Sequence, residues 1–527
     1  MENNKTCIAM VPCPGLSHLI PVVEFAKRLV LEHPNFQVTL LIPTLGPATP
    51  STKAILSSLP PTIESTILPQ VNLQDLPPNI HLATQMKLTV KYSLPSLHQA
   101  LTSLSSRTHL VALVCDLFSG DALSVAKVFN LSTFFFSTSG ATSLSFCLSL
   151  PQLDKRVTSE FITDTTEWVN FSGSSVPFHV HDLPDPVVLF GRSTETYKAF
   201  LRMCQRISSV DGVILNTFTD LEEDAIRAME EHQRRLSLAE GTNPGLDHNL
   251  NSGSMLREVL MFSTHEFSKP NFLEESEKNK RANANSECVY YFPLGPIVQT
   301  ESRSPGNESQ CIAWLEKQPQ KSVLFISFGS GGTLSHDQLS EIAFGLEISG
   351  HRFLWVIRVP NNVSSSAYFG GQKDDPLEYL PCGFLERVKG QGFVVPSWAP
   401  QVEVLGHGST GGFLTHCGWS SVLEGVVHGV PMIAWPLFAE QKMNATTICD
   451  ILQVAVRPRV AAESGLVKRE EVARVIKMVM EGDESLQMRK RVECLSLKAS
   501  RAMTEHGSST RALSSLALKL QSCNGKS

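Results

Sequence analysis

The stretch GGFLTHCGWSSVLEGVVHG, residues 411–429, contains a short apolar run, a glycine and then a helical pattern. It predicts a strand up to His416, a turn at Gly418 and a helix from Ser420 onward. A buried strand that enters a helix through a tight turn is the building unit of parallel α/β sheets. In such sheets ligands bind beyond the carboxyl ends of the strands, so this turn is a candidate binding site.

The same alternation of apolar runs and helical patterns recurs in both halves of the chain. The apolar runs include residues 7–11, 38–42, 110–115, 212–216, 322–328, 353–357 and 430–435. Fully apolar strands that are joined by helices predict a parallel sheet covered on both faces. A chain of 527 residues is too long for one hydrophobic core. We therefore expect an α/β protein with two Rossmann-like, doubly wound parallel-sheet domains that face a cleft.

Changes in composition mark the expected domain boundaries. We expect an N-terminal domain over residues 1–229 and a C-terminal domain over residues 289–500, which begins near VYYFPLGPIV. Residues 230–288 are polar and highly charged, and this composition predicts a largely disordered insertion or linker. Residues 501–527 contain one more helical pattern, which we expect to pack back on the N-terminal domain.

The overall composition restricts the possible partners and the compartment. The net charge of −6, without any basic run, gives no general attraction for nucleic acid or anionic lipid. The N-terminus lacks a secretory-signal pattern, and no uncharged apolar run approaches the ~20 residues that span a bilayer. The 12 cysteines are scattered, and we expect them to be reduced. These features predict a soluble, cytoplasmic protein that binds neither nucleic acid nor membranes.

Two polar residues follow apolar runs in the N-terminal half. His18 starts a helical pattern after a Pro/Gly turn, where the helix dipole tends to lower the pKa of an imidazole. Asp116 directly follows the apolar run at 110–115, where a buried acid needs a partner. Together they could form a general base, whereas the alternative for His18 is a helix cap without a catalytic role. Asp121 is a second candidate for the carboxylate of this pair. Because it lies in the following helix, we expect it to stabilise the first turn of that helix instead.

The turn at Gly418 allows several interpretations. A metal site is disfavoured because His416 and Cys417 are neighbours in a strand and point to opposite faces. Cysteine nucleophile chemistry lacks a clear partner residue. Ser421 and Glu424 fit a capping box, which would give them a structural role. A glycine turn at a helix N-terminus beside histidine and serine also suits an anion, so a phosphate cradle is the favoured interpretation.

A second glycine turn, SFGSGGTL at residues 327–334, ends another apolar run. Leu334 occupies the position of the last glycine of Gly-x-Gly-x-x-Gly, and the stretch is no Walker motif. Taken alone, it predicts a tight turn or a close approach of the backbone to a ligand.

The opening stretch belongs to a longer segment, WAPQVEVLGHGSTGGFLTHCGWSSVLEGVVHGVPMIAWPLFAEQ, residues 398–441. This segment closely resembles the C-terminal signature of plant secondary-product glycosyltransferases, the UDP-sugar-dependent family 1 enzymes of GT-B fold. The resemblance has no gap, and it extends to PCPGLSHLIPVVEFAKRL, VCDLFSGDA, GVILNTFTDLE, FISFGSGGTLS and FLWVIR. It covers nearly the whole chain apart from residues 230–288. SFGSGGTL, GFLERVKGQGFVVPSWAPQ and PLFAEQKMNA are most similar to the hydroquinone or monolignol glucosyltransferase branch.

The resemblance implies roles for the residues at matching positions. Uracil and ribose would be bound by Trp398, Ala399, Gln401 and Glu424. The diphosphate would be bound by Ser330, His416, Gly418, Ser420 and Ser421. The sugar would be bound by Trp419, Glu440 and Gln441. His18 and Asp116 would be the catalytic dyad.

The implied reaction transfers glucose from UDP-glucose, a co-substrate, to a small phenolic acceptor. A phenol has a pKa near ~10, so it is a poor nucleophile at neutral pH until His18 takes its proton. Attack from the face opposite UDP predicts inversion at the anomeric carbon. The leaving diphosphate would be stabilised by a helix N-terminus and His416 instead of a metal, and the chain contains no Asp-x-Asp. We expect a monomer without metal or cofactor.

The chain departs from the family pattern in three places. The family usually has asparagine where this chain has Ser420, and one lost hydrogen bond to a charged group would weaken binding by roughly 1.5–3 kcal/mol. The stretch STSGAT, residues 137–142, lacks the threonine expected near the sugar, and Gly140 occupies its place. Residues 230–288 stand where related chains have a short connection. They are either a surface insertion or the translation of sequence that should have been removed from the messenger RNA.

These departures support an alternative function, that of a catalytically weak UDP-sugar-binding relative. A third possibility is a nucleotide-dependent oxidoreductase of Rossmann type. The absence of Gly-x-Gly-x-x-Gly after the first predicted strand counts against it.

Overall fold

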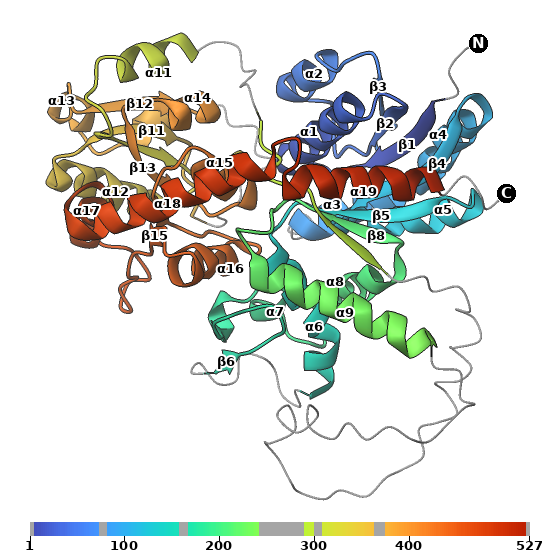
Figure 1. Cartoon of the computed structure of the whole chain (residues 1–527). Helices are drawn as coiled ribbons and strands as arrows, with labels where there is room; N and C mark the ends of the chain where they lie inside the picture. The colour runs from blue at the N-terminus through green and yellow to red at the C-terminus, as the bar shows by residue number, and fades with distance from the viewer. Residues whose placement is uncertain are drawn as a thin grey trace, which may run out of the picture.

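Two parallel sheets form the centres of two domains (Figure 1). The computed structural model describes residues 5–72, 82–156, 167–241, 289–299, 308–362 and 375–522. The prediction of two Rossmann-like domains is confirmed, because all neighbouring strands within each of these two sheets run parallel. No helix in these ranges combines the length and the apolar character that crossing a membrane requires.

The first sheet has the strand order β3-β2-β1-β4-β5-β8-β9. In chain order its strands are β1 (Thr6–Val11), β2 (Phe36–Ile42), β3 (Ile63–Ile67), β4 (His109–Asp116), β5 (Ser132–Ser137), β8 (Gly212–Leu215) and β9 (Tyr290–Pro293). Its helices are α1 (Leu16–Glu32), α2 (Pro50–Ser57), α3 (Leu82–Tyr92), α4 (Leu94–Arg107), α5 (Leu123–Val128), α6 (Ala141–Arg156), α7 (Asp185–Val188), α8 (Glu195–Arg206) and α9 (Glu223–Gly241). The short elements are η1 (Leu117–Ala122), η2 (Val180–Asp182), η3 (Ile207–Ser209) and the antiparallel pair β6 (Trp168–Val169) and β7 (Phe178–His179).

The second sheet has the strand order β12-β11-β10-β13-β14-β15. Its strands are β10 (Val323–Ser327), β11 (Arg352–Ile357), β12 (Gly392–Pro396), β13 (Thr410–Thr415), β14 (Met432–Ala434) and β15 (Ala455–Val456). Its helices are α11 (Glu308–Leu315), α12 (His336–Ser349), α13 (Phe384–Arg387), α14 (Gln401–Gly406), α15 (Trp419–Val427), α16 (Gln441–Thr446), α17 (Arg469–Met480) and α18 (Gly482–Ala502). The 3-10 helix η4 (Pro376–Tyr379) and the π-helix η5 (Thr447–Ile451) complete this domain, and α19 (Ser508–Ser522) follows it.

Burial on both faces explains why the strands are apolar throughout. All six residues of β1 are buried, and alternate side chains of the strand belong to different core clusters on the two faces of the sheet. The second sheet is covered in the same way, by α11, α14, α15 and α18 on one face and by α12, α13 and α17 on the other. A parallel sheet with helices on both faces leaves only the carboxyl ends of its strands open for ligands.

The predicted domain boundary at residue 289 is wrong. Strand β9 pairs with β8 and is the last strand of the first sheet, because its apolar side chains complete that sheet's core. Helix α9 extends to Gly241, so the first twelve residues of the segment predicted to be disordered are helical. The rest of that segment, residues 242–288, lies outside the described residues.

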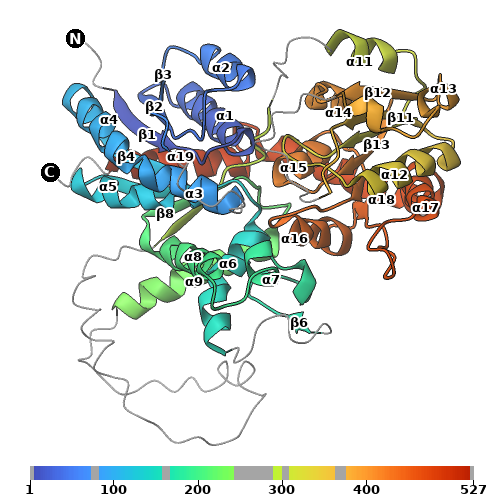
Figure 2. The same cartoon turned by 180° about the vertical axis from the view of Figure 1, so that it is seen from behind.

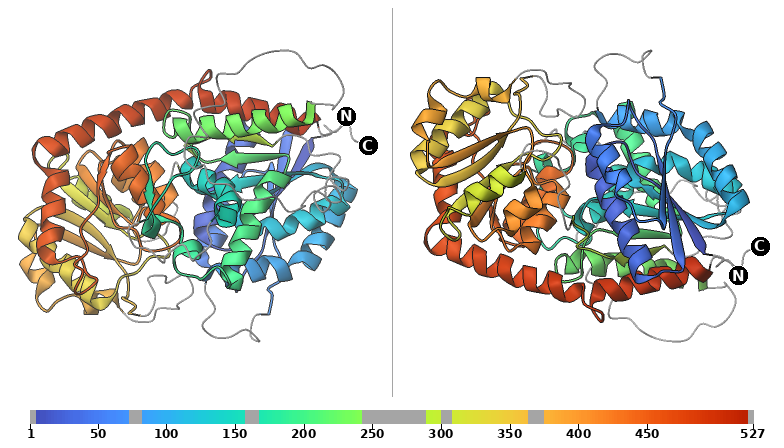
Figure 3. Two further views of the ribbon diagram at one scale, coloured as in Figure 1. Left: turned by 90° about the horizontal axis from the view of Figure 1, so that it is seen from below. Right: turned by 90° about the horizontal axis from the view of Figure 1, so that it is seen from above.

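The C-terminal helices connect the domains. Helix α18 packs in the second domain, whereas α19 packs on the first sheet and buries Leu513, Leu516 and Leu520 there. Figure 3 shows these two helices running along one side of both domains. The chain thus returns to the first domain at its end.

Polar contacts hold the domains together beside the carboxyl ends of the strands. The indole N–H of Trp419 in α15 donates to the carbonyl oxygen of Asn216, just after β8, at 2.7 Å. The backbone N–H of Ala439 donates to Asp185 Oδ2 at 2.5 Å, and the N–H of Asp185 donates back to the Ala439 carbonyl at 3.1 Å. Both overall views place α16 beside α7 (Figures 1 and 2). These contacts fix how the strand ends of the two domains face each other.

Candidate active site

A cleft of about 490 Å³ lies between the carboxyl ends of the two sheets. The first domain contributes the start of α1, the β5–α6 turn and residues around α7, and the second contributes turns after β10, β11 and β13. His18 and all twelve predicted donor-binding residues line this cleft, namely Ser330, Trp398, Ala399, Gln401, His416, Gly418, Trp419, Ser420, Ser421, Glu424, Glu440 and Gln441. Asp116 lies behind His18, fully buried. The structure therefore brings the predicted site residues from both halves of the chain to one place.

The pairing of two adjacent strands explains how His18 and Asp116 meet. Strand β1 pairs in parallel with β4, and Val11 is in register with Cys115. Asp116 ends β4, and His18 lies in the first turn of α1, which follows β1 through a tight turn at Gly15. Gly15 has a φ of 117°, a conformation that residues with a side chain rarely adopt. Residues 98 positions apart are thus placed side by side at one edge of the sheet.

The carboxylate of Asp116 accepts two hydrogen bonds. Its Oδ2 accepts from His18 Nδ1 at 2.8 Å, and its Oδ1 accepts from the backbone N–H of Phe118 at 2.9 Å. This arrangement fixes the orientation of the imidazole and leaves Nε2 as the ring nitrogen for a substrate proton. The competing candidate, Asp121, pairs instead with Arg206 at 2.5 Å. His18 and Asp116 thus form a hydrogen-bonded pair, whereas Asp121 takes no part in it.

The pKa of His18 is raised, not lowered as the helix-dipole reasoning predicted. Burial by itself lowers the pKa of this imidazole, but the charge and hydrogen bond of Asp116, together with the charge of Glu440, outweigh burial. A raised pKa makes the neutral imidazole of His18 a stronger base. His18 can accept a proton only at a pH at which the imidazole is neutral.

Cys13 lies near this pair, and its sulfur is within 4.8 Å of candidate ligand atoms on His18 and Asp116. Burial and the charge of Asp116 raise the pKa of the Cys13 thiol well above its usual value. A protonated thiol is a poor metal ligand, because the thiolate is the form that binds metals. The cluster therefore fits a hydrogen-bonded dyad better than a metal site.

The bend at residues 415–419 packs tightly around His416. A methyl group at Gly418 or Gly329 would collide with the His416 ring, so both glycines are required by close packing. Burial lowers the pKa of His416 to about 4, and the nearby Arg358 charge acts in the same direction. The ring is therefore neutral at physiological pH. Its buried Nδ1 has no hydrogen-bond partner within the described part of the chain.

The capping-box interpretation of Ser421 and Glu424 is wrong. Helix α15 begins at Trp419, with Gly418 as its N-cap, so the helix starts one residue earlier than predicted and Ser421 lies inside it. The side-chain amide of Gln401 donates to Ser421 Oγ at 2.9 Å and to Glu424 Oε2 at 2.6 Å. Both side chains thus belong to a polar cluster that lines the cleft.

Burial raises the pKa of Glu424 to about 7, although the hydrogen bond from Gln401 opposes this change. A buried carboxylate of this kind is stabilised by further O–H donors, such as a pair of ribose hydroxyls. Beside it, Ala399 is buried and Trp398 lines the cleft, following Ser397 with a positive φ of 68°. The buried indole N–H of Trp398 has no partner among the described residues. These side chains form a flat, partly apolar surface beside acceptors, which suits a base and ribose.

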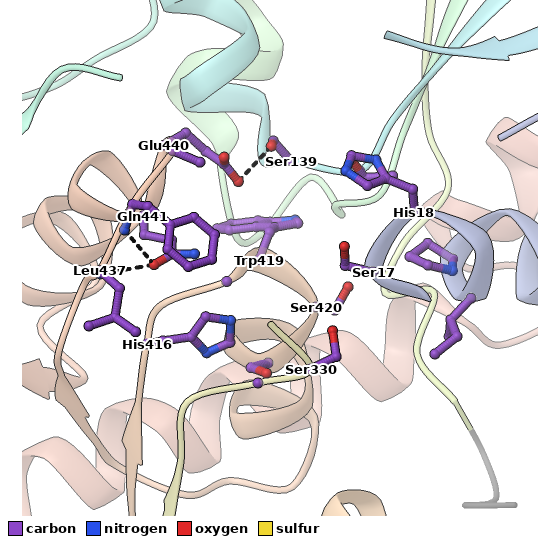
Figure 4. A pocket seen from close by; sticks show the side chains of 18 of the residues that line it. Ser17, His18, Ser139, Ser330, His416, Trp419, Ser420, Leu437, Glu440 and Gln441 are labelled. Carbon is purple, nitrogen blue, oxygen red and sulfur yellow. Dashed lines mark hydrogen bonds between the residues drawn. The ribbon is translucent and has the colours of Figure 1, made fainter. Parts of the chain in front are cut away.

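The predicted sugar-binding residues have partners within the protein. Gln441 Oε1 accepts from the backbone N–H groups of Leu437 and Phe438 at 2.9 and 3.0 Å. Glu440 Oε1 accepts from the Ser139 hydroxyl at 2.9 Å, across the domain interface (Figure 4). The indole N–H of Trp419 is engaged by Asn216, so Trp419 can offer only its ring or backbone to a sugar.

Gly140, which we expected at the place of the family threonine, lies where a side chain does not fit. A Cβ atom at residue 140 would lie 2.8 Å from Glu222 Oε1 and 2.9 Å from the Trp419 ring. The neighbouring Ser139 lines the cleft and supplies a hydroxyl beside Glu440. Ser139 was not predicted from the sequence, although the hydroxyls of STSGAT were a visible signal.

Ser17 and Arg358 are among the cleft residues that were not predicted from the sequence. Ser17, at the start of α1, lines the same cleft as Ser330 and Ser420 (Figure 4). Arg358 follows β11 and also lines the cleft. The arginine that ends FLWVIR was a visible signal, because a charge directly after an apolar strand lies at the ligand-binding edge.

The chain is similar in sequence to proteins of a known family. The sequence model of the family described as "UDP-glucoronosyl and UDP-glucosyl transferase" matches residues 299–490. Hydroquinone glucosyltransferase from Rauvolfia serpentina is 43% identical over 514 residues, which cover 97% of each chain. UDP-glycosyltransferase 72B1 from Arabidopsis thaliana is 43% identical over 524 residues, which cover 98% of this chain and 97% of the relative.

Solved structures show the same fold. A UDP-glucosyltransferase from Polygonum tinctorium capable of glucosylating indoxyl, in complex with 3,4-dichloroaniline, has a TM-score of 0.81 and 39% identity, covering 99% of this chain and 100% of that one. UGT2 from Phytolacca americana, in complex with UDP-2fluoro-glucose and pterostilbene, has a TM-score of 0.79 and 39% identity, covering 98% and 100%. The chain belongs to the plant family 1 UDP-glycosyltransferases, and it is a glycosyltransferase of GT-B fold that uses a UDP-sugar donor.

Proposed function

We propose that this protein transfers glucose from UDP-glucose to the hydroxyl group of small phenols, with inversion and without a metal. The observation that carries the proposal is the His18–Asp116 pair, whose His18 lines the same cleft as all twelve predicted donor-binding residues. The relationship to a hydroquinone glucosyltransferase supports a phenolic acceptor. The acceptor side of the cleft is lined by apolar side chains, including Ile20, Leu117, Phe118 and Leu144, which suit an aromatic ring.

His18 acts as the general base in this proposal. Its Nε2 accepts the phenol proton while Asp116, at Nδ1, stabilises the imidazolium that forms. The phenol oxygen then forms a bond to the anomeric carbon as the bond from that carbon to the UDP oxygen breaks. His18 projects from the first domain and the diphosphate-binding bend belongs to the second, so nucleophile and leaving group approach from opposite sides of the sugar. This geometry favours direct displacement.

The second domain stabilises the leaving group. The first backbone N–H groups of α15 have no partners inside the helix and carry the positive end of its dipole. His416 is neutral at physiological pH and can donate one N–H to a phosphate oxygen. Together with Ser330 and Ser421 these groups form a cradle for a diphosphate without a metal.

The alternative function, a catalytically weak UDP-sugar-binding relative, rests on Ser420, on the altered stretch STSGAT and on the insertion at residues 230–288. Ser139 of STSGAT places a hydroxyl beside Glu440, which weakens the second of these arguments. Most of the insertion lies outside the described residues, so Ser420 and the insertion stay in favour of the alternative.

The product of the reaction tests the proposal. Purified protein with UDP-glucose and a panel of hydroquinone, a monolignol and a flavonol is expected to yield β-glucosides, because direct displacement inverts the α-linkage of the donor. Proton NMR of the anomeric signal distinguishes the two configurations. An α-glucoside would contradict inversion, and UDP binding without turnover of any phenol would favour the weak relative.

The pH dependence tests the role of Asp116. His18 works as a base only when it is neutral, so transfer at saturating UDP-glucose should rise with pH through the raised pKa of His18, above 6.5. In Asp116→Asn the charge that raises this pKa is lost while burial still lowers it, so the rising limb should move to lower pH. The maximal rate should also fall, because the tautomer is no longer fixed. A rising limb that is unmoved in this variant would show that another group controls the profile.

Ser420 tests the donor side. Ser420→Asn should lower the apparent KM for UDP-glucose, because the longer amide can donate to the phosphate and regain up to roughly 1.5–3 kcal/mol. Ser420→Ala is the matched control, which removes the hydroxyl without adding a donor. An unchanged or raised KM in the asparagine variant would mean that this cleft is adapted to serine.

A further inference from the structure

Within the described part of the chain, the positive charge in the donor half of the cleft comes from one side chain. Among the described residues that line the cleft, Arg358 is the one arginine or lysine. His416 contributes no net charge at neutral pH, because burial lowers its pKa to about 4. The N-terminus of α15 contributes a partial charge of about half a unit. The diphosphate of a UDP-sugar carries full negative charges, so its binding in this cleft leaves a large charge for Arg358 to offset.

Arg358 is placed for this task by the sheet. It directly follows β11, which pairs with both β10 and β12. Its side chain therefore starts between the loop after β10, which contains Ser330, and the loop after β12, which contains Trp398. Charges at the carboxyl ends of the central strands of a parallel sheet lie where ligands bind.

The guanidinium connects these two loops. Nη1 donates to the carbonyl oxygen of Ser330 at 2.6 Å, and Nη2 donates to the carbonyl oxygen of Ser397 at 3.2 Å. Ser397 has a positive φ of 68° and directly precedes Trp398, so this contact holds a strained turn beside the base-binding surface. The planar fork of arginine allows both contacts from one side chain, which the single ammonium of lysine cannot reproduce in the same geometry.

The charge of Arg358 reaches the phosphate-binding bend. It is the one charged group that contributes to lowering the pKa of His416, which packs against Gly329 and Gly418. A cation that lies close enough to disfavour protonation of His416 also lies close enough to stabilise an anion that binds beside His416.

We propose that Arg358 is a donor-binding residue, which supplies the positive charge that offsets the UDP diphosphate and ties the Ser330 loop to the Trp398 loop. The proposal rests on the assignment of this half of the cleft to the UDP-sugar. It is independent of the phenolic acceptor and of the His18 mechanism. Because the charge neutralises the departing UDP as well as the bound donor, Arg358 takes the electrostatic part that a divalent cation plays in metal-dependent transferases.

The test is a comparison of nucleotide affinities by isothermal titration calorimetry with uridine, UMP and UDP. In Arg358→Gln the affinity for UDP should fall about ten-fold or more, because one charge-assisted contact is lost. The affinity for uridine should stay within about two-fold of that of the unmodified protein. UMP should lie between them. Raising the ionic strength should weaken UDP binding more in the unmodified protein than in this variant.

Two further variants make the test decisive. Arg352→Gln, at the exposed opposite end of β11, is the matched control and should leave all three affinities unchanged. Arg358→Lys keeps the positive charge but loses the planar guanidinium that makes both contacts. This variant should therefore bind UDP more tightly than Arg358→Gln. It also serves as the test if the glutamine variant does not fold. Equal losses for uridine and UDP would show that Arg358 only orders the loops and would overturn the proposal. Unchanged UDP binding, or a lysine variant no better than the glutamine variant, would overturn it too.

Because nucleotide binding is measured without acceptor, this experiment separates the proposal from the proposed function. A protein that binds UDP through Arg358 but transfers no glucose to phenols would support the first and contradict the second.

Discussion

A hydrogen bond between the Trp419 indole N–H and the Asn216 carbonyl joins the donor-binding helix of one domain to the sheet of the other. The ring of Trp419 also fills the space above Gly140, where no side chain fits. The cleft needs both domains, because its lining residues come from the carboxyl ends of both sheets. The proposed reaction depends on this cleft, because His18 belongs to the first domain and most of the predicted donor-binding residues belong to the second.

Within the cleft two histidines have opposite electrostatic surroundings. Asp116 raises the pKa of His18, whereas burial and Arg358 lower the pKa of His416. These shifts fit the roles that we propose, in which His18 takes up a proton and His416 stays a neutral hydrogen-bond donor. The charge beside each imidazole opposes the effect of burial on the pKa at His18 and adds to that effect at His416.

Much of this site follows from the sequence, for identifiable reasons. Asp116 and His18 could be predicted because parallel neighbouring strands end at the same edge, and the donor residues because their signature is uninterrupted over residues 398–441. Other features depend on contacts between distant segments that periodicity does not encode. Strand β9 joins the first sheet after a long intervening segment, and Trp419 finds a partner 203 residues away. The direction of the His18 pKa also required the positions of Asp116 and Glu440.

The central claim is that His18, oriented by Asp116, removes the acceptor proton in a cleft completed by the second domain. It is tested most directly by His18→Ala, assayed for phenol glucosylation and for UDP binding in parallel. We expect kcat/KM for the phenol to fall at least about 100-fold, the usual contribution of a general base, with UDP affinity unchanged. Near-normal glucosylation by this variant would contradict the account.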